Sequence, residues 1–275
     1  MDDAERRKII REMAREKDPD RYLAALFAPA GARDALFALY AFNAELAQIA
    51  DEVTEPTLGE IRLQWWRDAM QVAASGEATG HPVADAMGAA LQRHELPASR
   101  LDPMIDARRF DVLERIMPDS ASLLIYLDNT AGQAFLLACE CLGCDRERAG
   151  PAACAAGRAY GLTGLMRAVT VHAAQNRLYL PVQSLQTGAD QRLMAGHADP
   201  TFLGLMSELR RQAREELETA KPLIRALPKQ AQAAFKPLAL VEPYLKALEA
   251  IEDPMADLAD INPLHRLWRL TTWRP

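Results

Sequence analysis

The chain has 275 residues, 49% hydrophobic and 25% charged, which is an ordinary composition for a soluble globular protein and enough for one large domain. Its formal net charge of −6 and pI near 5.5, without a basic stripe, argue against non-specific nucleic-acid binding. The charged start and the lack of any run of about 18 apolar residues predict a cytoplasmic protein, at most peripheral to a membrane.

Apolar residues recur with a helical period along most of the chain, whereas β-branched residues are scarce and never alternate over a strand length. Proline and glycine separate the periodic segments. In chain order, we predict helices over 2–16, an apolar segment at 21–28, then 34–53, 57–70, 82–96, 100–116, 119–142, 151–171, a short helix within 182–199, 200–220, 227–235 and 237–250. Thr57, with Glu60 three residues later, predicts a capping box. The expected fold is all-α, a single-domain orthogonal bundle of about a dozen helices.

Two tryptophans and a C-terminal segment stand out along this order. Trp65 and Trp66 point about 100° apart on a helix, so we expect one in the core and the other at either the surface or a partner. The tail over 254–275 mixes Trp268 and Trp273 with arginines. That mixture suits a membrane interface, a partner groove, or docking on the bundle itself.

Three of the four cysteines, Cys139, Cys141 and Cys144, are close in sequence, with Cys154 ten residues further on. The group resembles a metal-ligand cluster in spacing, but it holds only one Cys-x-x-Cys pair. Residues two apart on a helix also point away from each other. We therefore predict buried thiols and no metal site.

The stretch from Arg158 to Pro181 organises the rest of the chain. On a period of 3.6, its residues Gly161, Gly164, Ala168 and His172 share one nearly bare helix face. Each glycine inside a helix costs about 1 kcal/mol relative to alanine. Close approach of a neighbouring helix or of a ligand would explain why both are kept.

This stretch resembles the second signature of the squalene/phytoene synthase family, whose members join two prenyl diphosphates head to head. Matching positions include Thr163, Arg167, Arg177, Tyr179, Leu180 and Pro181. The resemblance puts the family's glutamine at Gly161 and its asparagine at Gly164. It puts the two metal-binding aspartates at Ala168 and His172.

The first aspartate signature is altered in a similar way. Tyr40-Ala41-Phe42 matches the run that precedes it, and the resemblance places the two aspartates at Ala47 and Asp51, with Gln48 beside the first. Asp20 stands where the family has a phosphate-contacting serine, and its charge would repel a diphosphate. The resemblance spans about 20–249, between an N-terminal helix at 1–19 and the tail, and implies the family's helical bundle with a central cavity.

The family's reaction requires Mg²⁺ to neutralise a departing diphosphate, and Mg²⁺ prefers carboxylate oxygens. Of the four signature aspartates only Asp51 remains, so we expect no metal. Glu45 and Glu52 point about 120° and 100° away from it around the helix. An imidazole at His172 is no substitute for a carboxylate on this ion.

Loss of aspartates at both signatures resembles the family's non-catalytic branch, typified by the mitochondrial assembly factor for complex I. The resemblance implies a pseudoenzyme without a cofactor that works with respiratory-complex subunits. Two alternatives stay open: an active head-to-head prenyltransferase with unusual Mg²⁺ ligation, and a lipid-binding scaffold holding an isoprenoid or quinone. Remaining pocket candidates are Tyr40, Arg167, Arg177 and Tyr179. Pairing of these arginines with Asp106 or Asp111 is the structural alternative.

Overall fold

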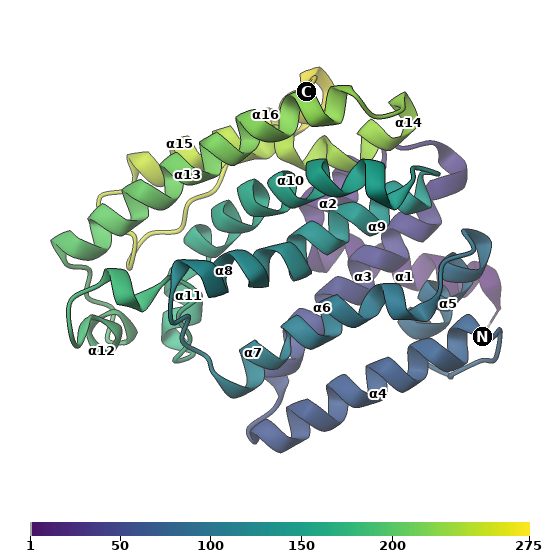
Figure 1. Ribbon diagram of the computed structural model, residues 1–275, viewed down its shortest axis with the longest axis horizontal. Coiled ribbons are helices and arrows are strands. Elements are labelled where there is room, and N and C mark those ends of the chain that lie inside the picture. Colours follow the sequence, from purple (N-terminus) through teal and green to yellow (C-terminus); the bar gives the residue numbers. More distant parts are fainter. Residues whose placement is uncertain (1) are drawn as a thin grey trace.

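A computed structural model describes residues 2–275, and nearly all of its regular structure is helical (Figure 1). The α-helices are α1 (Asp3–Lys17), α2 (Pro19–Ala25), α3 (Ala30–Glu52), α4 (Pro56–Ala74), α5 (Pro82–Arg93), α6 (Asp102–Ala107), α7 (Arg109–Leu113), α8 (Ser120–Leu127), α9 (Gln133–Cys141), α10 (Arg146–Arg167), α11 (Val169–Ala174), α12 (Ala189–Met194), α13 (Pro200–Arg225), α14 (Lys229–Gln232), α15 (Val241–Ala250) and α16 (Pro263–Thr272). A π-helical turn, η2 (Asp128–Gly132), joins α8 to α9, and 3-10 turns occur at η1 (Ala98–Leu101), η3 (Val182–Ser184) and η4 (Ala233–Leu240).

The helices surround one continuous core. In Figure 1, α4, α6 and α7 lie on one side and α13, α15 and α16 on the other, with α3, α9 and α10 between them. The core contains large, fully buried side chains such as Phe42, Phe202 and Phe235. Within 2–275 the only β pairing is one isolated bridge between Ile116 and Leu178. The predicted all-α, single-domain bundle is therefore confirmed.

Several helix boundaries differ from the prediction for local reasons. The capping box at Thr57 is wrong: α4 begins at Pro56, whose fixed φ suits the first helical position, and Glu55 precedes it. Helix α10 begins at Arg146 rather than near Pro151, because the Asp145 side chain accepts hydrogen bonds from the first turn. Likewise, α13 continues beyond 220 to Arg225.

Close helix crossing is achieved where two glycines meet. A Cβ added at Gly157 of α10 would lie 2.3 Å from the backbone of Gly132 in η2. No side chain fits in that space, so glycine is required there for packing rather than for an unusual φ.

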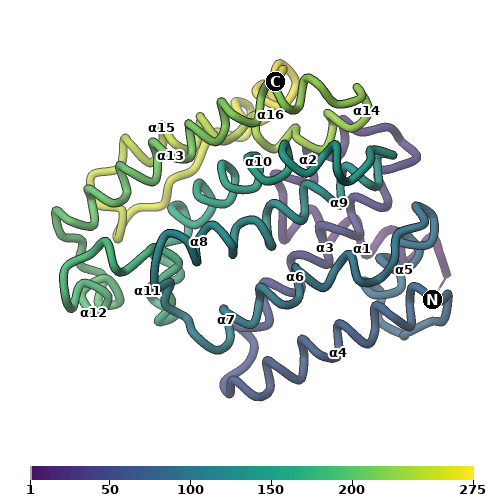
Figure 2. Tube along the Cα trace, viewed as in Figure 1, coloured from purple at the N-terminus to yellow at the C-terminus, as the bar shows by residue number. Residues whose placement is uncertain are grey.

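The C-terminal tail forms a helix that docks on the bundle. After α15 the chain runs back past the end of α10, where Arg167 donates to the carbonyl of Ala259, and enters α16, which the Asn262 side chain caps (Figure 2). Helix α16 buries Leu270 against a small apolar cluster formed with η4 and α2, while Trp273 is partly buried. Trp268 lies on the other face of the helix, 57% exposed.

Of the two adjacent tryptophans, Trp66 is buried in the core and packs on Phe42 with ring centroids 5.3 Å apart. Trp65 is 43% exposed on the outer side of α4. The expected division of the pair between core and surface is confirmed.

Candidate functional site

The residues of the two signatures lie on α3 and around the junction of α10 with α11. Helix α3 carries Tyr40, Ala47, Gln48 and Asp51, α10 carries Gly161, Gly164 and Arg167, and α11 carries His172. The backbone turns at Ala168 (φ −95°, ψ 5°), so the helix predicted over 151–171 is divided at that residue. The glycine face therefore does not continue straight into His172.

The segment after α11 is extended and forms backbone hydrogen bonds with the loop that contains Arg115 and Met117. Asn176 takes a left-handed conformation (φ 57°) that ends the helix. Leu178 then donates its N–H to the carbonyl of Arg115 at 2.8 Å and accepts from Met117 at 2.7 Å. These backbone bonds fix the direction of the two side chains on either side of Leu178, those of Arg177 and Tyr179.

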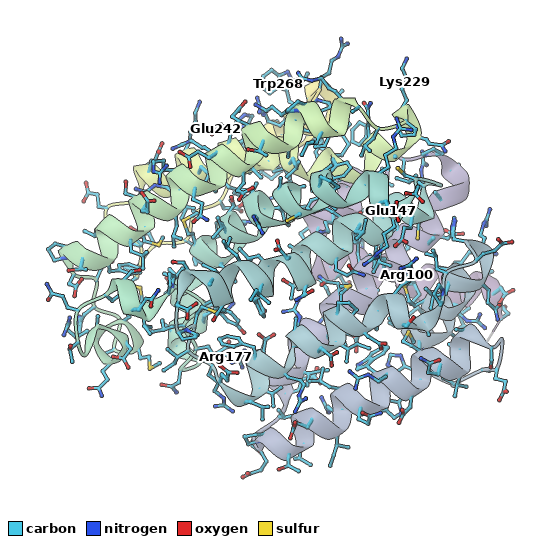
Figure 3. The ribbon with its side chains drawn as sticks, viewed as in Figure 1. Arg100, Glu147, Arg177, Lys229, Glu242 and Trp268 are labelled. Carbon is cyan, nitrogen blue, oxygen red and sulfur yellow. The ribbon has the colours of Figure 1, made fainter. Side chains whose placement is uncertain are left out.

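Arg177 closes the C-terminal end of α3. Its Nη1 lies 2.6 Å from Asp51 Oδ1, and its Nη2 donates to the carbonyl of Ala50 at 2.8 Å. The guanidinium is buried, and Figure 3 labels it near α7 and α11. A cation here is favoured by the unpaired carbonyls at the helix end. Pairing of Arg177 with Asp106 or Asp111 is therefore wrong, since other arginines occupy both.

His172 packs against Tyr179, with ring centroids 4.6 Å apart. Burial lowers the pKa of His172 to about 4, and the nearby positive charge of Arg177 acts in the same direction. The imidazole of His172 is therefore neutral at pH 7, next to the buried cation of Arg177.

Arg108, at the junction of α6 and α7, is the centre of a second cationic group, with its side chain 13% exposed. Its Nη1 donates to Asp111 Oδ2 at 3.0 Å and to the hydroxyl of Tyr126 at 2.8 Å, and its Nη2 reaches Asn43 of α3 at 3.4 Å. Asn43 and Asp51 are eight residues apart on α3, which puts them on one face with Ala47 between them. Along this face of α3, the guanidinium of Arg108 contacts the residue four before Ala47, and that of Arg177 contacts the residue four after it.

Asp20 is the centre of a third group, which the C-terminal helix completes. Tyr244 donates its hydroxyl to Asp20 Oδ2 at 2.7 Å, and Arg266 Nε lies 3.0 Å from Oδ1. Arg167 lies 3.8 Å from the same carboxylate and stacks 3.4 Å from the centroid of the Tyr244 ring. Burial raises the pKa of Asp20, although the Tyr244 hydrogen bond and the arginines oppose this. The chain's own carboxylate is thus the anion that these arginines hold.

Sequence reasoning missed Arg108 and Arg266 as members of these groups. A weak signal existed for Arg266, because a buried carboxylate at Asp20 requires a cationic or hydrogen-bonding partner. The tail contains arginines, but they are more than 200 residues from Asp20 in the sequence, so local patterns could not indicate the contact.

Tyr40 and Gln48 lie apart from the Arg177 group. Tyr40 is buried beside Arg21, whose guanidinium carbon lies 5.9 Å from the Tyr40 ring centroid and 4.5 Å from that of Tyr160. The Gln48 side chain accepts a hydrogen bond from Lys17 at 3.2 Å. Of the four predicted pocket residues, the structure brings only Arg177 and Tyr179 together with His172.

The two glycines of the bare face differ in their surroundings. A Cβ added at Gly161 would lie 2.5 Å from Leu127 Cδ2, so this glycine serves helix packing. One added at Gly164 would meet no atom within 4 Å. No neighbouring side chain therefore packs over Gly164.

The cysteines do not form a ligand set. Cys139 and Cys141 are buried, and burial raises the pKa of both thiols, that of Cys141 to about 12. Cys154 faces Asp128, its sulfur 3.2 Å from a carboxylate oxygen. In the part of the chain that the structure covers, 2–275, no three or more His, Cys, Asp and Glu side chains are grouped as metal ligands would be.

Comparison of the sequence with known families and proteins agrees with this fold. The family model for squalene/phytoene synthase matches residues 14–274. A Bos taurus protein named NADH dehydrogenase (ubiquinone) complex I, assembly factor 6, is 31% identical over 243 residues, covering 88% of this chain and 73% of the relative. A presqualene diphosphate synthase from Zymomonas mobilis is 27% identical over 217 residues, covering 78% and 74%.

Among solved structures, a dehydrosqualene synthase in complex with ligand superposes with a TM-score of 0.82. It covers 98% of this chain and 95% of that one at 16% identity, which establishes likeness of fold.

Proposed function

The chain belongs to the squalene/phytoene synthase family, and from that premise we propose that it is a non-catalytic member which assists the assembly of respiratory complex I. The observation that carries the proposal is the ion pair between Arg177 and Asp51. It places a guanidinium against the one carboxylate retained from the signatures.

The residues at the signature positions do not fit Mg²⁺. This ion takes oxygen ligands in near-octahedral geometry, usually including one or two carboxylates. Asp51 is held by Arg177, the side chains of Ala47 and Ala168 have no donor atom, and His172 offers only a neutral nitrogen. A metal entering here would lie beside the buried Arg177 guanidinium, a like charge, and would gain a single carboxylate as ligand. We therefore assign no step of catalysis to this site.

A second feature supports loss of diphosphate chemistry. The buried carboxylate of Asp20 is already the partner of Arg167, Arg266 and Tyr244, in the place that an anionic ligand would take. A diphosphate would have to compete with a carboxylate of like charge that is already desolvated and hydrogen-bonded. Binding of such a substrate is therefore opposed by electrostatics as well as by the missing metal ligands.

The assembly role itself is supported by the relatives. The Bos taurus relative is named as a complex I assembly factor and matches most of this chain. The proposed partners are subunits of the respiratory NADH dehydrogenase. The structure supplies a helical body in which the groups around Arg177, Arg108 and Asp20 tie α2, α3, α7 and α16 together.

Loss of catalysis is tested with the purified full chain, Mg²⁺, and farnesyl or geranylgeranyl diphosphate, with release of pyrophosphate as the readout. The Zymomonas mobilis presqualene diphosphate synthase serves as the positive control with farnesyl diphosphate. We expect release no faster than with buffer. Turnover comparable to the control would overturn the non-catalytic assignment and favour the prenyltransferase alternative, for which the 27% identity to that enzyme is the supporting observation.

The assembly role is tested by deleting the gene in the source organism and measuring NADH oxidation in isolated membranes. We expect reduced oxidation by complex I with succinate oxidation unchanged, and recovery when the wild-type chain is supplied. Unchanged NADH oxidation would refute the role in assembly even if the chain proves inactive on prenyl diphosphates.

Lipid binding is proposed as an accompanying property. A Cβ added at Gly164 would meet no atom within 4 Å, so this part of the α10 surface is left clear for contact with an apolar isoprenoid or quinone tail. Extraction of the purified protein followed by mass spectrometry should recover such a lipid in stoichiometric amount; its absence would leave a scaffold without a ligand.

Peripheral membrane contact is proposed for α16. Its outer face exposes Leu264, Leu267 and Trp268, with Arg274 after its end, an arrangement that suits the interface of a bilayer. None of the helices over residues 2–275 is long and apolar enough to cross a membrane. Sedimentation with anionic vesicles tests the contact.

A further inference from the structure

A pocket outside both signatures lies between α3, α4 and the start of α5. It has a volume of about 300 Å³ and is lined by Glu45, Ile49, Glu52, Arg62, Trp65, Trp66 and His81. Glu45, Ile49 and Glu52 are spaced i, i+4 and i+7 and so share one face of α3. None of the lining residues takes part in the groups around Arg177, Arg108 and Asp20 described above.

Aromatic rings form one wall of the pocket. The rings of Trp65 and Trp66 meet edge to face with centroids 5.0 Å apart, and the His81 ring lies 5.4 Å and 5.1 Å from them. His81 is the N-cap of α5, and its Nδ1 accepts the N–H of Ala84 at 3.4 Å, which holds the ring in place. The electron-rich faces of tryptophan attract cations.

The charges of the pocket leave one carboxylate uncompensated. Glu52 forms an ion pair with Arg62. Glu45 is half-buried, and its carboxylate makes neither a hydrogen bond nor an ion pair with any side chain or backbone group in 2–275. One negative charge next to indole rings therefore faces a space that is open at the surface, an environment suited to an organic cation.

An exposed apolar stripe continues from this pocket along α4. Leu58, Ile61, Trp65 and Val72 lie within about 60° of each other around the helix. Ile61 is 59% exposed, and Trp65 belongs to both the stripe and the pocket. Single exposed apolar residues are common, but four aligned on one outer helix mark an interaction surface.

We propose that the pocket receives the lysine or arginine side chain of a partner polypeptide whose apolar residues lie along this stripe of α4. The uncompensated Glu45 favours a basic anchor, and the tryptophans supply an aromatic wall against which it packs. From Leu58 to Val72 the stripe spans roughly 21 Å, longer than a lipid head group in the pocket would use. The inference does not depend on the function proposed above.

The test uses the ¹⁵N-labelled full chain and follows the indole N–H resonances of Trp65 and Trp66 by NMR. The probes are Nα-acetyl-arginine methylamide, its neutral citrulline analogue, choline chloride, and the blocked peptide Ac-Arg-Ala-Leu-Leu-NH₂. We expect saturable shifts with the blocked arginine at millimolar concentration and none with citrulline. The peptide should bind at least threefold tighter than the blocked arginine, and Ile61→Ser should remove that gain.

Glu45→Gln should weaken arginine binding at least fivefold, whereas Glu12→Gln, which removes an equal charge from the exposed side of α1, should not change it. Trp65→Leu assigns its resonance and gives a second test should Glu45→Gln fail to fold; binding followed at Trp66 should again fall at least fivefold. Equal shifts with citrulline, no saturation, or full binding by the folded Glu45→Gln protein would each overturn the proposal. Tighter binding of choline than of arginine would overturn it in favour of a quaternary-ammonium lipid.

Discussion

The ion pair between Arg177 and Asp51 makes an asymmetric prediction about stability. Arg177 is buried, with its side chain 8% exposed, while the Asp51 side chain is 42% exposed. Asp51→Ala therefore leaves a guanidinium that is largely shielded from water and has lost its counter-ion. Arg177→Met leaves a carboxylate that can rehydrate and one helix-end carbonyl without its donor.

The magnitudes follow from these exposures. Removing one partner of a fully buried pair costs about 3–5 kcal/mol, and the half-exposed carboxylate puts Asp51→Ala at the lower end, about 3 kcal/mol. Arg177→Met should cost about 1.5–2 kcal/mol, the loss of a charged hydrogen bond whose acceptor is partly solvated. The double variant should be more stable than the sum of the two losses predicts, by about 1 kcal/mol or more.

Urea unfolding of the four proteins, followed by far-ultraviolet circular dichroism, measures these free energies. A larger loss for Arg177→Met than for Asp51→Ala would refute the reasoning, as would a coupling energy below about 0.3 kcal/mol. Either result would mean that Asp51 is not the counter-ion of Arg177, and would remove the main support for a site closed to Mg²⁺.

Other expectations concern His172, the glycines of α10, and the exposed face of α16. Because the pKa of His172 is about 4 in the folded protein and the ordinary value is 6.5, the unfolded chain binds the proton more readily between these values. Stability should therefore fall as pH drops below 6.5, by about 2 kcal/mol at pH 5, and His172→Gln should remove that part of the pH dependence. Gly164→Ala should stabilise the protein by roughly 0.5–1 kcal/mol, since helix propensity rises and nothing obstructs the methyl group. Gly157→Ala should instead destabilise it by more than about 2 kcal/mol through collision with the Gly132 backbone, as thermal unfolding will show. Trp268→Ala should reduce sedimentation with anionic vesicles several-fold without lowering the melting temperature, and an unchanged bound fraction would contradict membrane contact through α16.

The positions of most helices were predictable because each is encoded by local periodicity and by nearby proline, glycine and capping residues. The errors fall where two local signals compete. At α4, Pro56 starts the helix ahead of the attractive capping pair at Thr57, and at α10, Asp145 starts it ahead of Pro151. The helix in the tail was missed because its few apolar positions become meaningful only against the surface formed by η4 and α2.

The candidate site was predictable as a set of positions and not as a set of contacts. The resemblance located Asp51, His172, Arg177 and Tyr179, but it could not say which charge each arginine would meet. Asp20 lies at the start of the stretch that the resemblance covers, and Arg266 lies in the tail beyond it. The resemblance therefore gave no reason to pair them, although the fold brings them together.

By itself, the sequence determined an all-helical chain of this family and the residue types at its signature positions, because both are written in short-range patterns. Only the tertiary structure decided that Arg177 meets Asp51 across 126 residues, and that Asp20 meets Tyr244 across 224. Such pairs depend on which helix ends the packed core brings together, and a buried charge accepts whichever partner lies within hydrogen-bonding distance.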